Sequence, residues 1–65
     1  MITINGEKTA VREGTDLLSW LNSSGIHPDA IAVEYNGEIL RRPDFGNTVL
    51  QNGDKIEIVR FMAGG

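Results

Sequence analysis

The 65-residue chain is long enough for one small domain, and it contains no cysteine, which excludes disulfides, thiolate catalysis and cysteine-ligated zinc. Its formal net charge is −3 and its six lysines and arginines are scattered, so no basic stripe for nucleic acid is present. The longest apolar run, residues 30–33, is too short to cross a bilayer, and the N-terminus lacks the features of a signal peptide. We therefore expect a cytoplasmic protein that binds neither nucleic acid nor membrane.

The first twelve residues predict a β-hairpin. Residues 1–5 alternate apolar and polar side chains, which is the period of a half-buried strand. Asn5-Gly6 follows and is typical of a tight hairpin turn. Residues 8–12 supply the return strand.

A helix is expected next. Thr15 is the predicted N-cap, with Asp16 in the first turn, where the helix dipole favours an anion. Gly25 is a typical helix terminator, and His27 precedes a proline, which disfavours helical backbone. One face of this helix carries Leu17, Leu18 and Leu21.

Three further strand signals divide the rest of the chain. Residues 31–35 predict a strand, Asn36-Gly37 a second tight turn, and residues 38–40 a short strand beyond it. Residues 41–47 read as an irregular crossover with a helical turn that places Phe45 in the core.

The last strand is predicted over residues 55–60, after a turn at residues 52–54. Strands before and after one helix indicate an α+β fold in which the main helix packs across one face of a mixed β-sheet. With the first and last strands parallel in the middle of the sheet, this is the ubiquitin-like β-grasp arrangement. Residues 1–60 form the expected β-grasp domain, and residues 61–65 form an expected flexible C-terminal tail ending in Gly-Gly.

No catalytic constellation is visible in the sequence. The single histidine, His27, lies in a turn and is interpreted as solvated. The nine carboxylate side chains are spread along the chain without a spacing that demands acid–base catalysis, and all are interpreted as solvated surface, Asp54 included as part of a turn. Trp20, on the flank of the leucine face, is expected to cover the edge of the core. We expect no bound metal or cofactor and no enzymatic activity of the chain alone.

The C-terminus is the one place where chemistry is expected. Gly64 and Gly65 lack side chains and could thread a narrow channel, carrying the terminal carboxylate to a remote active site. That carboxylate is ionised at neutral pH and is a weak nucleophile toward the α-phosphate of ATP. The negative charge of the carboxylate is repelled by ATP, so a partner would have to supply Mg²⁺ and cationic groups to offset this repulsion.

Several pieces of the chain together resemble the ThiS family of sulfur carrier proteins in thiamine biosynthesis. The resemblance covers the whole chain and is carried by INGE, TDLLSWL, AVEYNGEIL, residues 53–58 and the terminal AGG. It implies that Gly65 is adenylated by a ubiquitin-activating-like adenylyltransferase, which uses ATP and Mg²⁺, and then becomes a thiocarboxylate. It also implies a sulfur-donor protein and a thiazole synthase as partners, and we expect the free protein to be a monomer.

The period of two along residues 55–60 predicts a docking strip beside the tail. If Ile56 and Ile58 face the helix, Val59 points outward and forms an apolar strip with Phe61. We expect this strip to dock the activating enzyme and the synthase. The remaining predicted partner contacts are Met62, Ala63 and Gly64.

Two other interpretations of the sequence stay open. Carriers for molybdopterin synthesis and for tRNA thiolation share the Gly-Gly ending and differ in the acceptor of sulfur. A β-grasp interaction module with an incidental Gly-Gly would share the fold without the chemistry.

Overall fold

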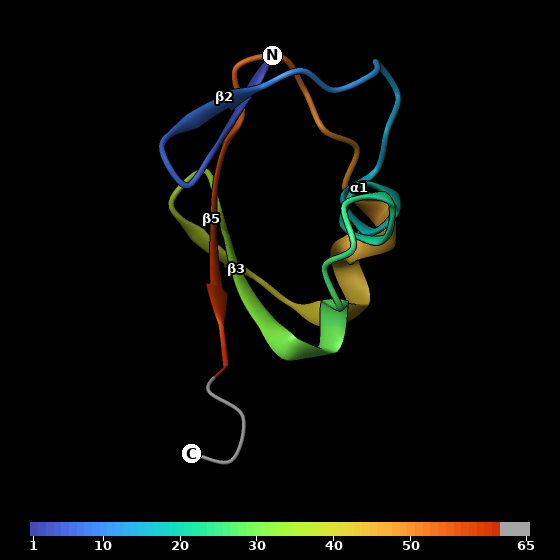
Figure 1. The fold of residues 1–65 in the computed structure, drawn as a ribbon, viewed down its shortest axis with the longest axis vertical. Helices are drawn as coiled ribbons and strands as arrows, with labels where there is room; N and C mark the ends of the chain where they lie inside the picture. The colour runs from blue at the N-terminus through green and yellow to red at the C-terminus, as the bar shows by residue number, and fades with distance from the viewer. Residues whose placement is uncertain (62–65) are drawn as a thin grey trace.

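A computed structural model describes residues 1–61 of the chain and confirms the expected α+β fold. One five-stranded sheet has the strand order β2-β1-β5-β3-β4. Figure 1 shows this sheet on one side of the molecule and helix α1, with the gold 3-10 helix η2, on the other. The elements are β1 (Ile2–Ile4), β2 (Glu7–Thr9), α1 (Leu17–Ser23), η1 (Pro28–Ala30), β3 (Ile31–Tyr35), β4 (Glu38–Leu40), η2 (Arg42–Asn47) and β5 (Lys55–Arg60).

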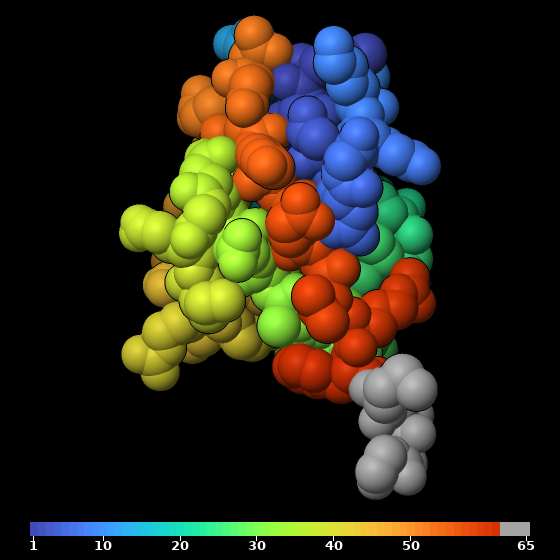
Figure 2. All heavy atoms as spheres, turned by 90° about the vertical axis from the view of Figure 1, so that its left-hand side faces the viewer, coloured from blue at the N-terminus to red at the C-terminus, as the bar shows by residue number. Residues whose placement is uncertain are grey.

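The sheet has the predicted mixed pairing. β5 lies at its centre, parallel to β1 and antiparallel to β3, while the two hairpins β1–β2 and β3–β4 form its flanks. In Figure 2 the outer face of the sheet is turned to the viewer, and β5 runs between the blue N-terminal hairpin and the green and yellow β3–β4 hairpin.

The Asn-Gly pairs at residues 5–6 and 36–37 form the predicted tight hairpin turns. Asn5 and Gly6 have φ angles of 48° and 85°, and Asn36 and Gly37 have φ angles of 51° and 88°. Positive φ at both central residues is the requirement of the hairpin turn that Asn-Gly favours. The return strand is shorter than predicted, because β2 ends at Thr9. Thr9 pairs with Ile2, the first residue of β1, so residues 10–12 have no partner strand beside them.

The helix begins one residue later than predicted. Asp16, not Thr15, is the N-cap: its two carboxylate oxygens accept hydrogen bonds from the backbone N–H and the hydroxyl of Ser19, at 2.9 and 2.7 Å. These hydrogen bonds hold the pKa of Asp16 below its ordinary value. Thr15 instead uses its backbone carbonyl to accept a bond from the N–H of Leu50, at 2.8 Å, which ties it to the loop before β5.

The helix ends as its glycine predicts. Gly25 has a φ of 74° and its N–H donates to Asn22, while the N–H of Ile26 donates to the carbonyl of Leu21 at 2.9 Å. This pair of bonds is the Schellman motif, which requires a left-handed residue after the helix. Ile26 then turns back to pack against the core.

The core lies between the inner face of the sheet and the layer formed by α1 and η2. Phe45 is buried, as predicted, and Trp20 is half-buried against the edge of this core, also as predicted. The buried apolar residues are Ile2, Leu17, Leu21, Ile31, Val33, Phe45, Leu50 and Ile56.

Candidate functional site

The site predicted at the C-terminus begins where β5 leaves the sheet. The N–H of Phe61 donates to the carbonyl of Ala30 at 2.8 Å, so the pairing of β5 with the β3 side continues to the last described residue. Of the predicted site residues, Val59 and Phe61 are therefore placed by the structure. The other four lie outside the described residues, namely Met62, Ala63, Gly64 and Gly65.

The alternation predicted for β5 is confirmed. Ile56 is fully buried and Ile58 packs against the core from a half-buried position, so both lie on the inner face. Val59 points to the outer face and is 63% exposed, and Phe61 beyond it is 60% exposed. We refer to Val59 and Phe61 as the exit strip, because they are the last exposed apolar residues that the structure describes.

Ile39 is an exposed apolar residue on the same face that the sequence analysis did not single out. It is 72% exposed on β4 and pairs with Glu34, while Ala32, two residues before Glu34 on β3, pairs with Val59. Residues two apart on a strand share a face, so Ile39 and Ala32 continue the apolar surface away from Val59. The sequence gives no signal for it, because Ile39 and Leu40 are adjacent apolar residues and the pattern of residues 38–40 does not say which of them faces outward.

Two like charges stand beside this apolar surface. Glu34 on β3 and Glu57 on β5 are direct cross-strand partners on the outer face. Like charges in that position destabilise a sheet, and the one ion pair within residues 1–61 lies elsewhere, between Arg42 and Asp29. The outer face thus carries, next to its apolar surface, two carboxylates that form no ion pair within residues 1–61.

Asp54 is buried, so the expectation that every carboxylate is solvated was wrong for this residue. It is 8% exposed and accepts three hydrogen bonds. The donors are the hydroxyl of Tyr35, the side-chain amide of Asn36 at 3.1 Å and the backbone N–H of Gln51 at 2.7 Å. This network ties the β3–β4 turn to the start of β5, and it explains how a carboxylate is tolerated there.

The hydrogen bonds decide the charge state of this pair. Burial would raise the pKa of Asp54, but the bonds from Tyr35, Gln51 and Asn36 outweigh it and hold that pKa below the ordinary value of 3.8. For Tyr35, burial, the hydrogen bond to Asp54 and the negative charge of Asp54 all favour the neutral phenol and raise its pKa to about 12. Asp54 is therefore charged and Tyr35 is neutral at physiological pH.

Replacing Tyr35 by phenylalanine tests the network without removing the aromatic ring. A group whose pKa is lowered by folding stabilises the protein above its unfolded pKa, and this contribution is lost as the pH falls through the folded pKa. The Y35F variant lacks one of the bonds to charged Asp54, so it should lose about 1–3 kcal/mol of unfolding free energy at neutral pH.

This loss of unfolding free energy should become smaller as the pH falls, because the hydroxyl of Tyr35 stabilises protonated Asp54 less than charged Asp54. The measurement is urea unfolding at a series of pH values from about 6 to 2. A cost that stays constant across this range would mean that the charge of Asp54 is not what Tyr35 stabilises. At the alkaline end, the contribution of Tyr35 in the wild type should be lost as the pH rises through about 12.

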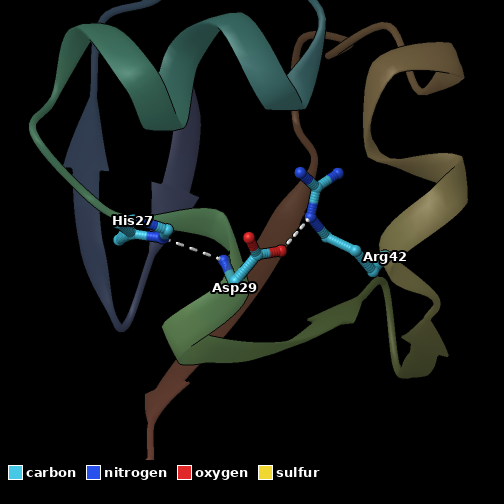
Figure 3. Close-up of polar contacts among 3 residues, drawn as sticks. All are labelled: His27, Asp29 and Arg42. Atoms are coloured by element: carbon cyan, nitrogen blue, oxygen red, sulfur yellow. Dashed lines mark hydrogen bonds and ion pairs between the residues drawn. The ribbon is translucent and has the colours of Figure 1, made fainter.

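His27 is exposed, as predicted, and has a local structural contact. Its Nδ1 accepts a hydrogen bond from the backbone N–H of Asp29 at 3.3 Å, which caps η1. Asp29 in turn pairs with Arg42 at 2.8 Å and so connects η1 to η2 (Figure 3). Within residues 1–61, no three His, Cys, Asp or Glu side chains gather where they could ligate a metal ion.

A hollow of about 420 Å³ lies away from the exit of β5. It is found at the N-terminal end of the molecule, and Figure 1 shows that β5 ends at the opposite end. It is lined by Met1, Ile2, Val11, Arg12, Glu13, Leu50, Gln51 and Asn52. In the part of the chain that the structure covers, no helix has the length and apolar character needed to cross a membrane.

The fold and the exit strip define a class of protein: a β-grasp domain with exposed apolar residues where its central strand leaves the sheet. The model of the ThiS family matches residues 2–65, which includes both terminal glycines. The chain therefore belongs to the ThiS family.

Solved structures agree with this family. The crystal structure of the thiamine biosynthesis protein ThiS from Geobacter metallireducens is 33% identical and superposes with a TM-score of 0.83, covering 98% of this chain and 97% of that chain. An NMR structure of a thiamine biosynthesis protein from the same organism gives 31% identity and a TM-score of 0.77, covering 98% of this chain and 86% of that chain.

Similar sequences occur in two settings. A thiazole synthase of Magnetococcus marinus is 41% identical over 64 residues, which are 98% of this chain and 20% of that protein. The uncharacterized protein ycf40 of Porphyra purpurea is 34% identical over 98% of this chain and 90% of its own length. The chain thus spans about one fifth of the thiazole synthases that it matches, and nearly all of ycf40.

Proposed function

We propose that this protein carries sulfur for the formation of the thiamine thiazole ring, as a thiocarboxylate on Gly65. The observation that carries the proposal is the family match, which runs through the terminal Gly-Gly. The fold supports it, because β5 is held in the sheet as far as Phe61. Gly65 is four residues beyond Phe61 and can lie at most about 13–14 Å from it when the chain is extended.

The first step of the proposed chemistry activates the carboxylate. One oxygen of the Gly65 carboxylate attacks the α-phosphorus of ATP, the bond from that phosphorus to the bridging oxygen breaks, and pyrophosphate leaves. The product is an acyl-adenylate. A ubiquitin-activating-like adenylyltransferase supplies the ATP site, and its Mg²⁺ and cationic groups offset the repulsion between carboxylate and phosphate. The chain itself contributes the nucleophile and its approach.

The second step exchanges oxygen for sulfur. A nucleophile of the hydrosulfide class, delivered by a sulfur-donor protein, attacks the activated carbonyl carbon. The bond to AMP breaks, AMP takes its electron pair, and loss of the thiol proton leaves the thiocarboxylate. A thiazole synthase then accepts the sulfur. The similarity between this whole chain and a segment of two thiazole synthases supports that last partner.

The exit strip is the proposed docking surface for the activating enzyme and the synthase. Val59 and Phe61 are both more than half exposed and lie next to the tail, which would carry Met62, Ala63 and Gly64 into the partner's channel. Glu34 and Glu57 lie beside the strip and form no ion pair within the described residues, which favours a partner surface that is apolar with a basic rim.

Replacing Val59 by aspartate should weaken both complexes by at least tenfold, because a carboxylate would have to lose its water at an apolar contact. Ala10→Asp is the matched control, since Ala10 is exposed, lies outside the sheet and receives the same charge. Binding is measured by titration calorimetry against each partner, and folding by thermal unfolding. If the two variants bind with equal affinity, the exit strip is not part of the interface.

The proposed function is tested first by mixing the wild-type protein with the activating enzyme and ATP. Release of pyrophosphate that depends on the presence of the carrier supports activation of Gly65. An interaction module with an incidental Gly-Gly would release none.

A further inference from the structure

Asn5 does more than form the turn between β1 and β2. Its side-chain Oδ1 accepts a hydrogen bond from the N–H of Ile58 at 2.7 Å, and its Nδ2 donates to the carbonyl of Ile58 at 3.2 Å. The backbone N–H of Asn5 donates to the carbonyl of Ile56 at 2.9 Å. One turn residue thus binds three backbone groups of β5, the strand that leads to the C-terminus.

These bonds take the place of β1, which ends before β5 does. β1 pairs with β5 only at Thr3↔Lys55 and Ile4↔Ile56, because the chain reverses direction at Asn5-Gly6. Beyond that point, the backbone of Ile58 has no strand on its β1 side. A primary amide has one acceptor oxygen and donor N–H groups, like a peptide bond, so the side chain of Asn5 continues the ladder by one step.

The consequence is that the end of β5 is held on both sides. β3 holds one side through the pairs of Val59 with Ala32 and of Arg60 with Ile31, and the carbonyl of Ala30 binds the N–H of Phe61. Asn5 holds the other side at Ile58, three residues before Phe61. Without it, the last part of β5 would be bound along one edge alone.

We propose that Asn5 is a positioning residue for the sulfur-carrier reaction. It keeps the end of β5 in the sheet, so that the chain leaves the domain at Phe61 from a fixed point and in a fixed direction. The inference rests on the proposed function, because a defined exit matters only if Gly65 must reach an active site in a partner. An error of about 1 Å in the placement of a reacting group can cost on the order of 100-fold in rate.

Asparagine suits this position for two separate reasons. The turn needs a positive φ, which glycine, asparagine and aspartate tolerate best. Glycine has no amide. Aspartate could accept the bond from the N–H of Ile58, but its carboxylate could not donate to the carbonyl of Ile58 and would repel it. Asparagine alone among the three supplies both a donor and an acceptor.

The test compares Asn5→Gly with Asn36→Gly. Each change removes an asparagine amide and leaves a glycine that accepts the positive φ of the same kind of turn. Asn36 binds the other end of β5: its Oδ1 accepts from the N–H of Lys55 at 2.8 Å and its Nδ2 donates to buried Asp54. If the rate falls only because the fold is less stable, the loss of rate should therefore be at least as large in N36G as in N5G.

Two measurements separate positioning from stability. Amide hydrogen exchange by NMR should be at least tenfold faster at Ile58 in N5G. The β5 amides near Val59 that donate to β3 should also lose protection from exchange. In N36G the loss of protection should instead fall at the start of β5. ATP–pyrophosphate exchange, run with the full-length protein and its activating enzyme, should show a roughly tenfold lower rate at saturating N5G. The concentration of carrier at half-maximal rate should change little, because N5G keeps the side chains of Val59 and Phe61.

Several results would overturn the inference: wild-type protection of Ile58 in N5G, an unchanged saturating rate, or an equal loss of rate in N36G. If the wild-type protein itself supports no exchange, the proposed function fails. In that case the hydrogen-exchange data alone decide whether Asn5 fixes the end of β5.

Discussion

The variant Gly64→Val, and a variant with one residue added after Gly65, should each lose about 100-fold or more in ATP–pyrophosphate exchange with the activating enzyme. Valine adds a branched side chain where the proposed channel has no room, and it restricts the backbone. The added residue moves the carboxylate away from the α-phosphate of ATP. Both variants should unfold at the wild-type temperature, because residues after Phe61 come after the last strand of the domain.

The added residue also provides a rescue control. Removing it with a carboxypeptidase restores the Gly65 carboxylate and should restore the rate. If either variant is adenylated at the wild-type rate, the Gly-Gly ending is not the reactive element, and the proposed function loses its main support.

Phe45→Ala should cost about 3–5 kcal/mol of unfolding free energy. Phe45 is 1% exposed and fills the space between η2 and the rest of the core. A domain of this length has a total stability of roughly 3–10 kcal/mol, so this single change should leave a large part of the protein unfolded at physiological temperature.

Phe61→Ala is the matched control for Phe45→Ala. It makes the same change of side chain at a position that is 60% exposed. Its loss of unfolding free energy, measured in urea, should be much smaller than that of Phe45→Ala. If the two substitutions cost the same, η2 does not cover the core in the way described. Phe61→Ala should instead weaken partner binding, since Phe61 belongs to the exit strip.

The elements that the sequence predicted correctly depend on local chemistry. The Asn-Gly turns at residues 5–6 and 36–37 need positive φ at consecutive residues, and the end of α1 at Gly25 needs a left-handed residue. Alternation along residues 55–60 placed Ile56 inside and Val59 outside. Each of these signals lies within a few residues of the structure that it predicts.

The features that the sequence did not reveal depend on contacts between distant segments. Thr15 and Asp16 are both good N-cap residues. Asp16 caps the helix, while the carbonyl of Thr15 accepts a hydrogen bond from the distant N–H of Leu50. Asp54 looks like an ordinary turn carboxylate until Tyr35, 19 residues away, donates its hydroxyl to it. The contact between Asn5 and Ile58 spans 53 residues. Periodicity and turn propensity carry no information about such pairs.

The candidate site also has a part that the sequence reveals and a part that it does not. The terminal glycines and the outward position of Val59 could be read from the sequence, and the family match extends over both. The continuation of the apolar surface to Ile39 follows from the register of β4 and β3 with β5. The sequence alone does not give that register.

A sulfur carried on the carboxylate of Gly65, as proposed, would change the mass of the protein. The most direct test is the mass of the intact protein after incubation with the activating enzyme, ATP, Mg²⁺ and a sulfur-donor protein. We expect a gain equal to the exchange of one oxygen for one sulfur, located by fragmentation on Gly65 and absent when ATP is omitted. An unchanged mass, or sulfur found on any other residue, would contradict the proposal.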